Sequence, residues 1–64
     1  MSFGERVRSY RKSVDISQKE LAEKIGISQN LLSLYECDRV QPTLERIEWI
    51  CKALEITATE LLGF

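Results

Sequence analysis

Three Ser/Thr-x-x-Glu segments are the feature of this sequence that most limits its fold. They run from Ser2 to Glu5, from Ser17 to Glu20 and from Thr57 to Glu60. Each has the pattern of a capping box, in which the hydroxyl accepts a hydrogen bond from the third helical N–H and the glutamate bonds to the N–H of the cap residue. Each segment therefore predicts the start of a helix. Because these starts lie near both ends of the chain and in between, we expect an all-α fold.

Further caps and helix breakers extend this prediction to five helices. Ser28 and Thr43 can cap a third and a fourth helix, and Pro42 favours a loop over the preceding residues. Gly26 can close the second helix because glycine readily adopts a positive φ. The expected helices run from about Phe3 to Ser13, from after Ser17 to Gly26, from Gln29 to about Glu36, from after Thr43 through Leu54, and from after Thr57 to near Gly63.

Apolar residues spaced by three and four positions predict which helix faces are buried. The first helix is expected to bury one stripe, and so is the fourth. The predicted buried residues are Phe3, Val7, Tyr10 and Val14 in the first helix, Leu21, Ala22 and Ile25 in the second, Leu32 and Tyr35 in the third, Leu44, Ile47, Ile50, Cys51 and Leu54 in the fourth, and Leu61 in the last.

The length of the chain argues against catalysis. Its 64 residues suit one compact domain, residues 1–64, without a second lobe or a large cleft. The sequence has no histidine, no phosphate-binding glycine loop and no nucleophile beside a base, so we expect no enzyme. Two cysteines far apart cannot form a zinc site, and no metal or cofactor is expected. The absence of a long apolar run and of a leader-like start predicts a cytoplasmic protein without a membrane segment.

Charge is distributed unevenly along the chain. The net charge is −1, which gives no overall attraction to nucleic acid. The first 32 residues carry six basic and four acidic side chains, whereas the remainder carries three basic and six acidic ones. One end of the molecule is therefore predicted to face phosphate and the other solvent or a partner.

The segment from Gln18 to Tyr35 has the pattern that two helices crossing through a tight turn require. Ala22 is small enough to let the third helix approach the second, and Gly26 provides the bend. Ile27 and Leu32 are expected to fill the space between the two helices. This pattern predicts a helix-turn-helix.

At this point the sequence resembles the phage repressor and Cro-like helix-turn-helix family, often called the XRE family, over nearly its whole length. The resemblance implies a five-helix lambda-repressor-like domain that reads operator DNA in the major groove, usually as a symmetric dimer. The matching residues are Phe3 to Val7, Arg11, Ser17, Gln18, Glu20 to Ala22, Ile25 to Ser28, Leu32, Tyr35, Glu36, Pro42 to Leu44, Ala53, Leu54 and Glu60 to Leu62.

The resemblance also implies roles for residues around the second and third helices. Gln18 matches a glutamine that contacts phosphate, although a solvated first-turn residue would look the same. Gln29, Asn30 and Ser33 match base-contacting positions, and Gln and Asn amides can pair with adenine; any surface helix can also carry such residues. Ser28 is expected to reach phosphate or a base edge.

Leu31 and Leu34 are unusual on a polar face. We expect Leu34 to lie against a thymine methyl group, although it can also mark a surface for another protein.

Other residues are expected to support DNA binding from outside the third helix. Arg8, Lys12 and Arg39 are candidates for phosphate contacts, with Arg6 as a further one. Arg11 and Glu36 match a structural ion pair of the family. A redox role for Cys37 is a minor alternative.

Trp49 stands where the family commonly has a polar residue, which suggests an interface. Together with Leu62 and Phe64 it is predicted to form a self-complementary patch of a homodimer; alternatively, Trp49 folds over the edge of its own domain.

We therefore expect a sequence-specific regulator of transcription, a repressor, that binds double-stranded DNA at an inverted-repeat operator as a homodimer. Two alternatives remain open. The chain can be an antitoxin or controller protein of a toxin or restriction-modification system, with a protein partner besides DNA. It can also be a protein-interaction module of the same fold that does not bind DNA.

Overall fold

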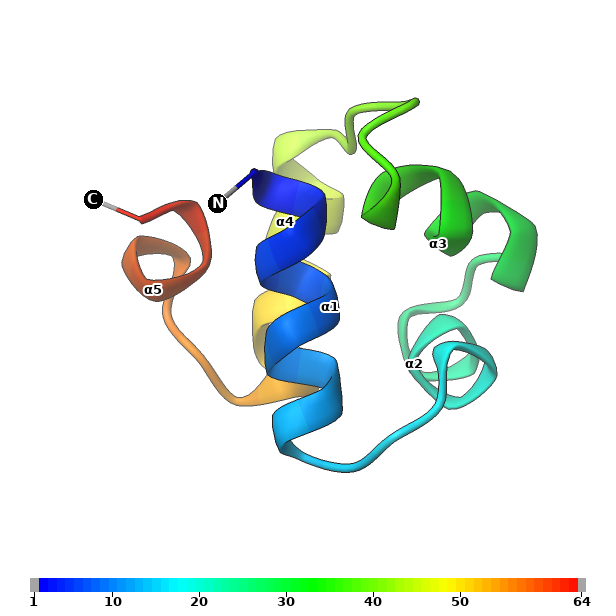
Figure 1. The fold of residues 1–64 in the computed structure, drawn as a ribbon, viewed down its shortest axis with the longest axis horizontal. Coiled ribbons are helices and arrows are strands. Elements are labelled where there is room, and N and C mark those ends of the chain that lie inside the picture. The colour runs from blue at the N-terminus through cyan, green and yellow to red at the C-terminus, as the bar shows by residue number, and fades with distance from the viewer. Residues whose placement is uncertain (1, 64) are drawn as a thin grey trace.

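The structure, a computed structural model, describes residues 2–63, which form five α-helices and no strand (Figure 1). This confirms the predicted all-α fold and its five helices. The helices are α1 (Phe3–Ser13), α2 (Gln18–Ile25), α3 (Gln29–Glu36), α4 (Leu44–Leu54) and α5 (Ala58–Leu62).

Side-chain caps define the start of every helix. The hydroxyls of Ser2, Ser17, Ser28, Thr43 and Thr57 each accept a hydrogen bond from the backbone N–H three residues later. The three predicted capping boxes are all formed, because the glutamates of α1, α2 and α5 also bond to the N–H of their cap residues. Gly26 closes α2 with a φ of 75°. Local sequence signals therefore set the helix boundaries.

The helices pack around one centre. In Figure 1, α1 lies in front of α4, with α2 and α3 on one side of this pair and α5 on the other. α1 contacts α3, α4 and α5, whereas α2 contacts α3 and α4. The ends of α2 and α3 therefore project from the side of the molecule opposite α5.

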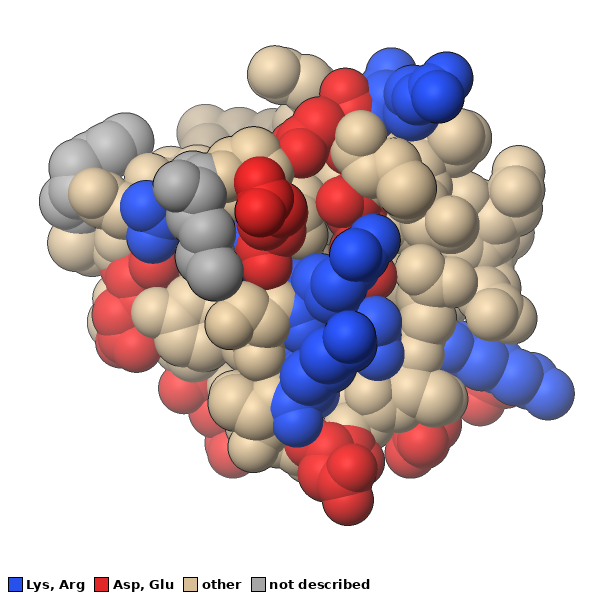
Figure 2. Space-filling view, in the orientation of Figure 1, with Lys and Arg blue, Asp and Glu red and all other residues tan. Residues whose placement is uncertain are grey.

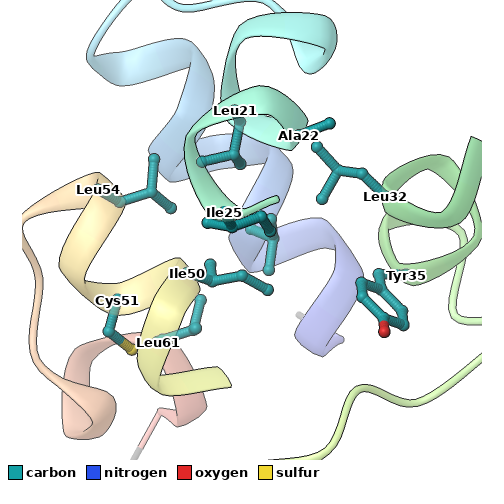
Figure 3. Close-up of a cluster of buried hydrophobic side chains, with 10 residues drawn as sticks. Leu21, Ala22, Ile25, Leu32, Tyr35, Ile50, Cys51, Leu54 and Leu61 are labelled. Carbon is teal, nitrogen blue, oxygen red and sulfur yellow. The ribbon is translucent and has the colours of Figure 1, made fainter. Parts of the chain in front are cut away.

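The core lies where these helices meet. Figure 3 shows side chains of α2, α3, α4 and α5 directed toward one another. Burial raises the pKa of the Cys51 thiol, so this side chain stays neutral and acts as a small apolar residue. The buried apolar residues are Val7, Leu21, Ala22, Ile25, Leu32, Tyr35, Ile50, Cys51, Leu54 and Leu61.

Two residues predicted to be buried are exposed. Val14 is 48% exposed and Leu44 is 70% exposed. Val14 is the C-cap of α1 and Leu44 is the first residue of α4. Both predictions were wrong because the apolar pattern continues to the end of each helix, beyond the part that neighbouring helices cover.

Gly4 permits the close approach of α1 to the end of α3. It is buried, and a Cβ at this position would collide with the backbone carbonyl oxygens of Tyr35 and Glu36. The start of α1 can therefore lie against the last turn of α3 only because residue 4 has no side chain.

Candidate nucleic-acid interface

Four of the predicted DNA-contacting residues lie together at the ends of α2 and α3. Gln18 is the first residue of α2 and Gln29 is the first residue of α3. The Gln29 amide Nε2 donates a hydrogen bond to Gln18 Oε1 at 3.4 Å. These two residues line a shallow hollow with Asn30 and Ser33. The structure thus forms one polar surface from two helix N-termini.

The exposed face of α3 is polar at its start and partly apolar further along. Gln29 and Asn30 are exposed, whereas Ser33 and Leu34 are half-buried. Leu31 packs against the core, which accounts for one of the two leucines that look out of place in the sequence. Leu34 remains a candidate for an apolar contact beside the polar surface.

The helix starts leave backbone donors at this surface. The first N–H groups of any α-helix lack partners within the helix, and the helix dipole adds partial positive charge at that end. The Ser28 hydroxyl accepts a hydrogen bond from the N–H of Leu31 at 3.1 Å, so Ser28 holds the start of α3 as its cap. An anionic phosphate is the ligand that such an end binds most readily.

A buried carboxylate connects this surface to α1. Glu36 is 2% exposed. Its Oε2 accepts from Arg11 Nε at 2.8 Å and its Oε1 from Arg11 Nη2 at 3.1 Å. The structure therefore brings the expected pair together, with two hydrogen bonds between the guanidinium and the carboxylate. The remaining nitrogen, Arg11 Nη1, donates a hydrogen bond to the carbonyl oxygen of Ile16 at 3.0 Å.

Glu36 also contacts two residues for which the sequence analysis predicts only phosphate contacts. Gln18 Nε2 donates to Glu36 Oε1 at 3.3 Å, and Arg8 Nε lies 3.7 Å from the same oxygen. The Arg8 side chain is still 46% exposed. A continuous set of contacts thus runs from α1 through Glu36 to Gln18 and on to Gln29. This set orients both glutamines before any ligand arrives.

Basic side chains extend the surface outward. Figure 2 shows Lys and Arg gathered over α1, with further ones beside α2 and near the loop that follows α3. Arg8 and Lys12 are exposed on α1, and Arg39 is exposed in the loop. Acidic side chains form several separate groups around them in this view. The net negative charge is therefore compatible with a locally positive face.

Asp38 is a structural residue that the sequence patterns did not single out. It adopts a φ of 60° after α3. Its carboxylate accepts from Ser2 Oγ at 2.5 Å and from the Gly4 N–H at 2.9 Å. These hydrogen bonds lower the pKa of Asp38. The loop after α3 is thereby attached to the start of α1, a long-range contact that local sequence does not reveal.

The residues predicted to form one dimer patch lie in two separate places. Trp49 lines a hollow with Lys24, Ile25, Lys52 and Ala53. Leu62 lines another, whose other members are Phe3, Asp38, Val40, Gln41, Pro42 and Ile47. Positions 47 and 49 of a helix point about 200° apart, so the two hollows are on opposite sides of α4. Phe64 lies outside the described residues.

The described part of the chain shows neither a metal-ligand group nor a membrane-spanning helix. Among residues 2–63, no group of three or more His, Cys, Asp or Glu side chains is placed to bind a metal ion. None of the described helices combines the length and the apolar character that a bilayer-spanning helix needs.

The crossing of α2 and α3, with a polar surface at the start of both helices, defines a helix-turn-helix domain. A family model described as "Helix-turn-helix" matches residues 7–61. The chain belongs to this family.

Similar proteins include two phage-related repressors. The chain is 35% identical over 63 residues to the immunity repressor protein of Bacillus phage phi105 and 38% identical over 63 residues to the cryptic phage CTXphi transcriptional repressor RstR of Vibrio cholerae. These alignments cover 98% of the chain but 44% and 56% of the two relatives. The chain thus spans about half the length of these curated relatives.

The fold is also close to a solved complex. The P22 c2 repressor protein bound to a synthetic operator superposes with a TM-score of 0.90 and 32% sequence identity, over 97% of this chain and 94% of that chain. The family and fold implied by the sequence resemblance are therefore confirmed.

Proposed function

We propose that this protein is a transcriptional repressor that places α3 in the major groove of double-stranded operator DNA. The joint polar surface of Gln18, Gln29, Asn30 and Ser33 carries this proposal. Membership of the helix-turn-helix family and the similarity to an operator-bound repressor support it. Such a regulator acts in the cytoplasm, on DNA, and needs no cofactor.

Within this surface the residues have different tasks. Gln29 and Asn30 contact base edges, because each carries a donor and an acceptor on one planar amide. Gln18 and Ser28 contact phosphate at the starts of α2 and α3. Ser33 and Leu34, half-buried further along α3, contact the adjacent bases.

Charged residues add affinity without sequence preference. Arg8, Lys12 and Arg39 are exposed on the flanks of this surface and bind the phosphates on either side of the bases. Neutralising several phosphates releases counterions, so affinity falls steeply with salt.

A homodimer completes the function. The hollow lined by Val40, Pro42, Ile47 and Leu62 lies beside the loop that follows α3, and the two nearby apolar residues Val40 and Leu44 are 39% and 70% exposed. A second copy that covers this surface about a two-fold axis would bring two recognition helices to successive major grooves, roughly 34 Å apart on an inverted repeat.

Selection of bound sequences from a random duplex pool, followed by anisotropy titrations, tests the proposal. We expect an inverted repeat to be enriched, and Gln29→Ala to lower affinity for it by about 1 to 3 kcal/mol. The same variant is expected to bind random duplex as the parent does. Glu23→Ala, an exposed change on α2 outside the polar surface, is the matched control. Equal weakening on selected and random duplexes would contradict the assignment of Gln29 to base contact.

A further inference from the structure

Leu34 is the leucine of α3 that the core does not cover. Leu32 is buried and Leu31 packs against the buried core residues. Leu34 is half-buried and, within residues 2–63, lies outside this packing. It follows Asn30 by four residues, so it continues the exposed face of α3 beyond the polar hollow. Its side chain therefore offers an apolar contact to whatever binds at that face.

The loop after α3 fixes the backbone of Leu34. The carbonyl oxygen of Leu34 accepts hydrogen bonds from the N–H groups of Arg39 at 2.9 Å and Val40 at 3.4 Å. Both donors lie beyond Glu36, the last residue of α3, so these bonds hold the last turn of the helix in place. Binding therefore requires no ordering of the backbone at Leu34, and a contact made by its side chain keeps most of its free energy.

The position of Leu34 on α3 separates it from the pair of glutamines. Gln18 contacts Gln29 and Glu36 along one edge of the exposed face. Leu34 follows Gln29 by five residues, which places it about 140° around the helix and about 7.5 Å further along the axis. Successive bases of a strand are about 3.4 Å apart. When α3 lies along the major groove, Leu34 is therefore about two base pairs from the base that Gln29 contacts.

A leucine side chain has no hydrogen-bond donor or acceptor, which limits what it can recognise. Among the groups that the four bases present in the major groove, the C5 methyl of thymine is the apolar one. The amino group of cytosine and the acceptors of guanine would be left without partners against a leucine, which is unfavourable. A 5-methylcytosine carries the same methyl group at the same ring position as thymine. The chemistry of the side chain thus favours a C5-methylated pyrimidine.

We propose that Leu34 recognises the C5 methyl group of a pyrimidine in the operator. The inference rests on the proposed function and adds to it the chemical group that is recognised. A thymine occupies this position in each half-site, and uracil, which lacks the methyl group, binds more weakly there. A 5-methylcytosine at the same position binds more tightly than cytosine. Methylation of a cytosine at this position of a site therefore raises its occupancy by the protein.

The test compares duplexes that differ by one methyl group, starting from the operator enriched in the random-pool selection. Each thymine of one half-site is replaced in turn by uracil. At the position that responds, a cytosine–guanine pair is then compared with a 5-methylcytosine–guanine pair. Removal of one buried methyl group is expected to weaken binding about fourfold in both comparisons. Anisotropy titrations measure these ratios, and base pairing is unchanged within each comparison.

Substitution of Leu34 then identifies the residue that senses the methyl group. Leu34→Ala and the polar variant Leu34→Asn are each expected to bind both members of a pair of duplexes with equal affinity. Leu34→Met keeps a flexible apolar side chain and is expected to retain the difference. Val14→Ala shortens an exposed apolar side chain at the end of α1 and is the control, with the full fourfold ratio expected. Circular dichroism verifies that each variant is folded.

Two results would overturn this proposal while leaving the proposed function intact. One is an enriched operator on which neither uracil nor 5-methylcytosine changes the affinity. The other is a methyl effect of equal size in the parent and in the Leu34 variants, which would assign it to another residue or to the stiffness of the duplex. Failure to enrich any operator would instead refute the proposed function, and this inference with it.

Discussion

Arg11 and Glu36 form a two-point ion pair, with N–O distances of 2.8 and 3.1 Å, that connects the last turn of α1 to the last residue of α3. The Glu36 side chain is fully buried and that of Arg11 is 11% exposed. The pair therefore fixes the position of α3 relative to the rest of the domain. Its geometry also determines where Gln18 lies, because Gln18 bonds to the same carboxylate.

Removing Arg11 is expected to destabilise the fold strongly. Arg11→Ala leaves the Glu36 carboxylate buried with only the hydrogen bond from Gln18 and the more distant Arg8, which costs about 3 kcal/mol or more. Thermal and urea unfolding followed by circular dichroism measure this cost. Lys12→Ala, a neighbouring exposed change, is the control. An unchanged melting temperature for Arg11→Ala would show that the pair contributes little.

Gly4 and Gly26 are expected to respond differently to alanine. Gly4→Ala forces a Cβ into the backbone carbonyls of Tyr35 and Glu36, an overpacking cost of about 2 kcal/mol. Gly26 has open space where a Cβ would lie. Gly26→Ala is therefore expected to lower the stability only by the cost of placing alanine in a left-handed conformation, about 1 kcal/mol. The free energies of unfolding of both variants, measured under one set of conditions, show which substitution destabilises the fold more. A larger loss for Gly26→Ala would contradict the close approach of α1 to α3.

The Asp38 carboxylate is expected to make stability depend on acid pH. Hydrogen bonds from Ser2 and Gly4 lower its native pKa, whereas the unfolded chain keeps an ordinary value of about 3.9. The stabilisation is therefore complete above about pH 5 and is lost as the pH falls through the native pKa.

Asp38→Asn isolates this effect. Asparagine tolerates the same positive φ but cannot ionise, so the variant is expected to be less stable than the parent at pH 7. Urea unfolding of both proteins between pH 7 and pH 2 should show the difference narrowing at low pH. A difference that is constant over this range would exclude the carboxylate as its source.

Gln18 is expected to contribute affinity rather than specificity. Gln18→Ala removes the proposed phosphate contact and one hydrogen bond to Glu36, so binding should weaken by a similar factor on selected and random duplexes. Because the side chain is uncharged, the salt dependence of binding should stay the same. Anisotropy titrations at several salt concentrations measure both quantities. A change in sequence preference would instead place Gln18 against a base.

Local signals in the sequence predicted the helices well, because caps and the glycine at position 26 act within a few residues. The errors at Val14 and Leu44 arose where periodicity alone was extended to helix ends. The contacts of Asp38 with Ser2 and Gly4, and of Gln18 with Glu36, join residues far apart in the chain. Periodic patterns carry no information about such contacts, so the sequence does not predict how these side chains meet inside the candidate site.

α5 lies on the side of the molecule opposite α2 and α3 (Figure 1), and Arg6 of α1 lies beside Gly63. A label or fused protein attached after α5 would therefore project away from the helices proposed to meet DNA. Such a fusion should mark the protein without obstructing those helices.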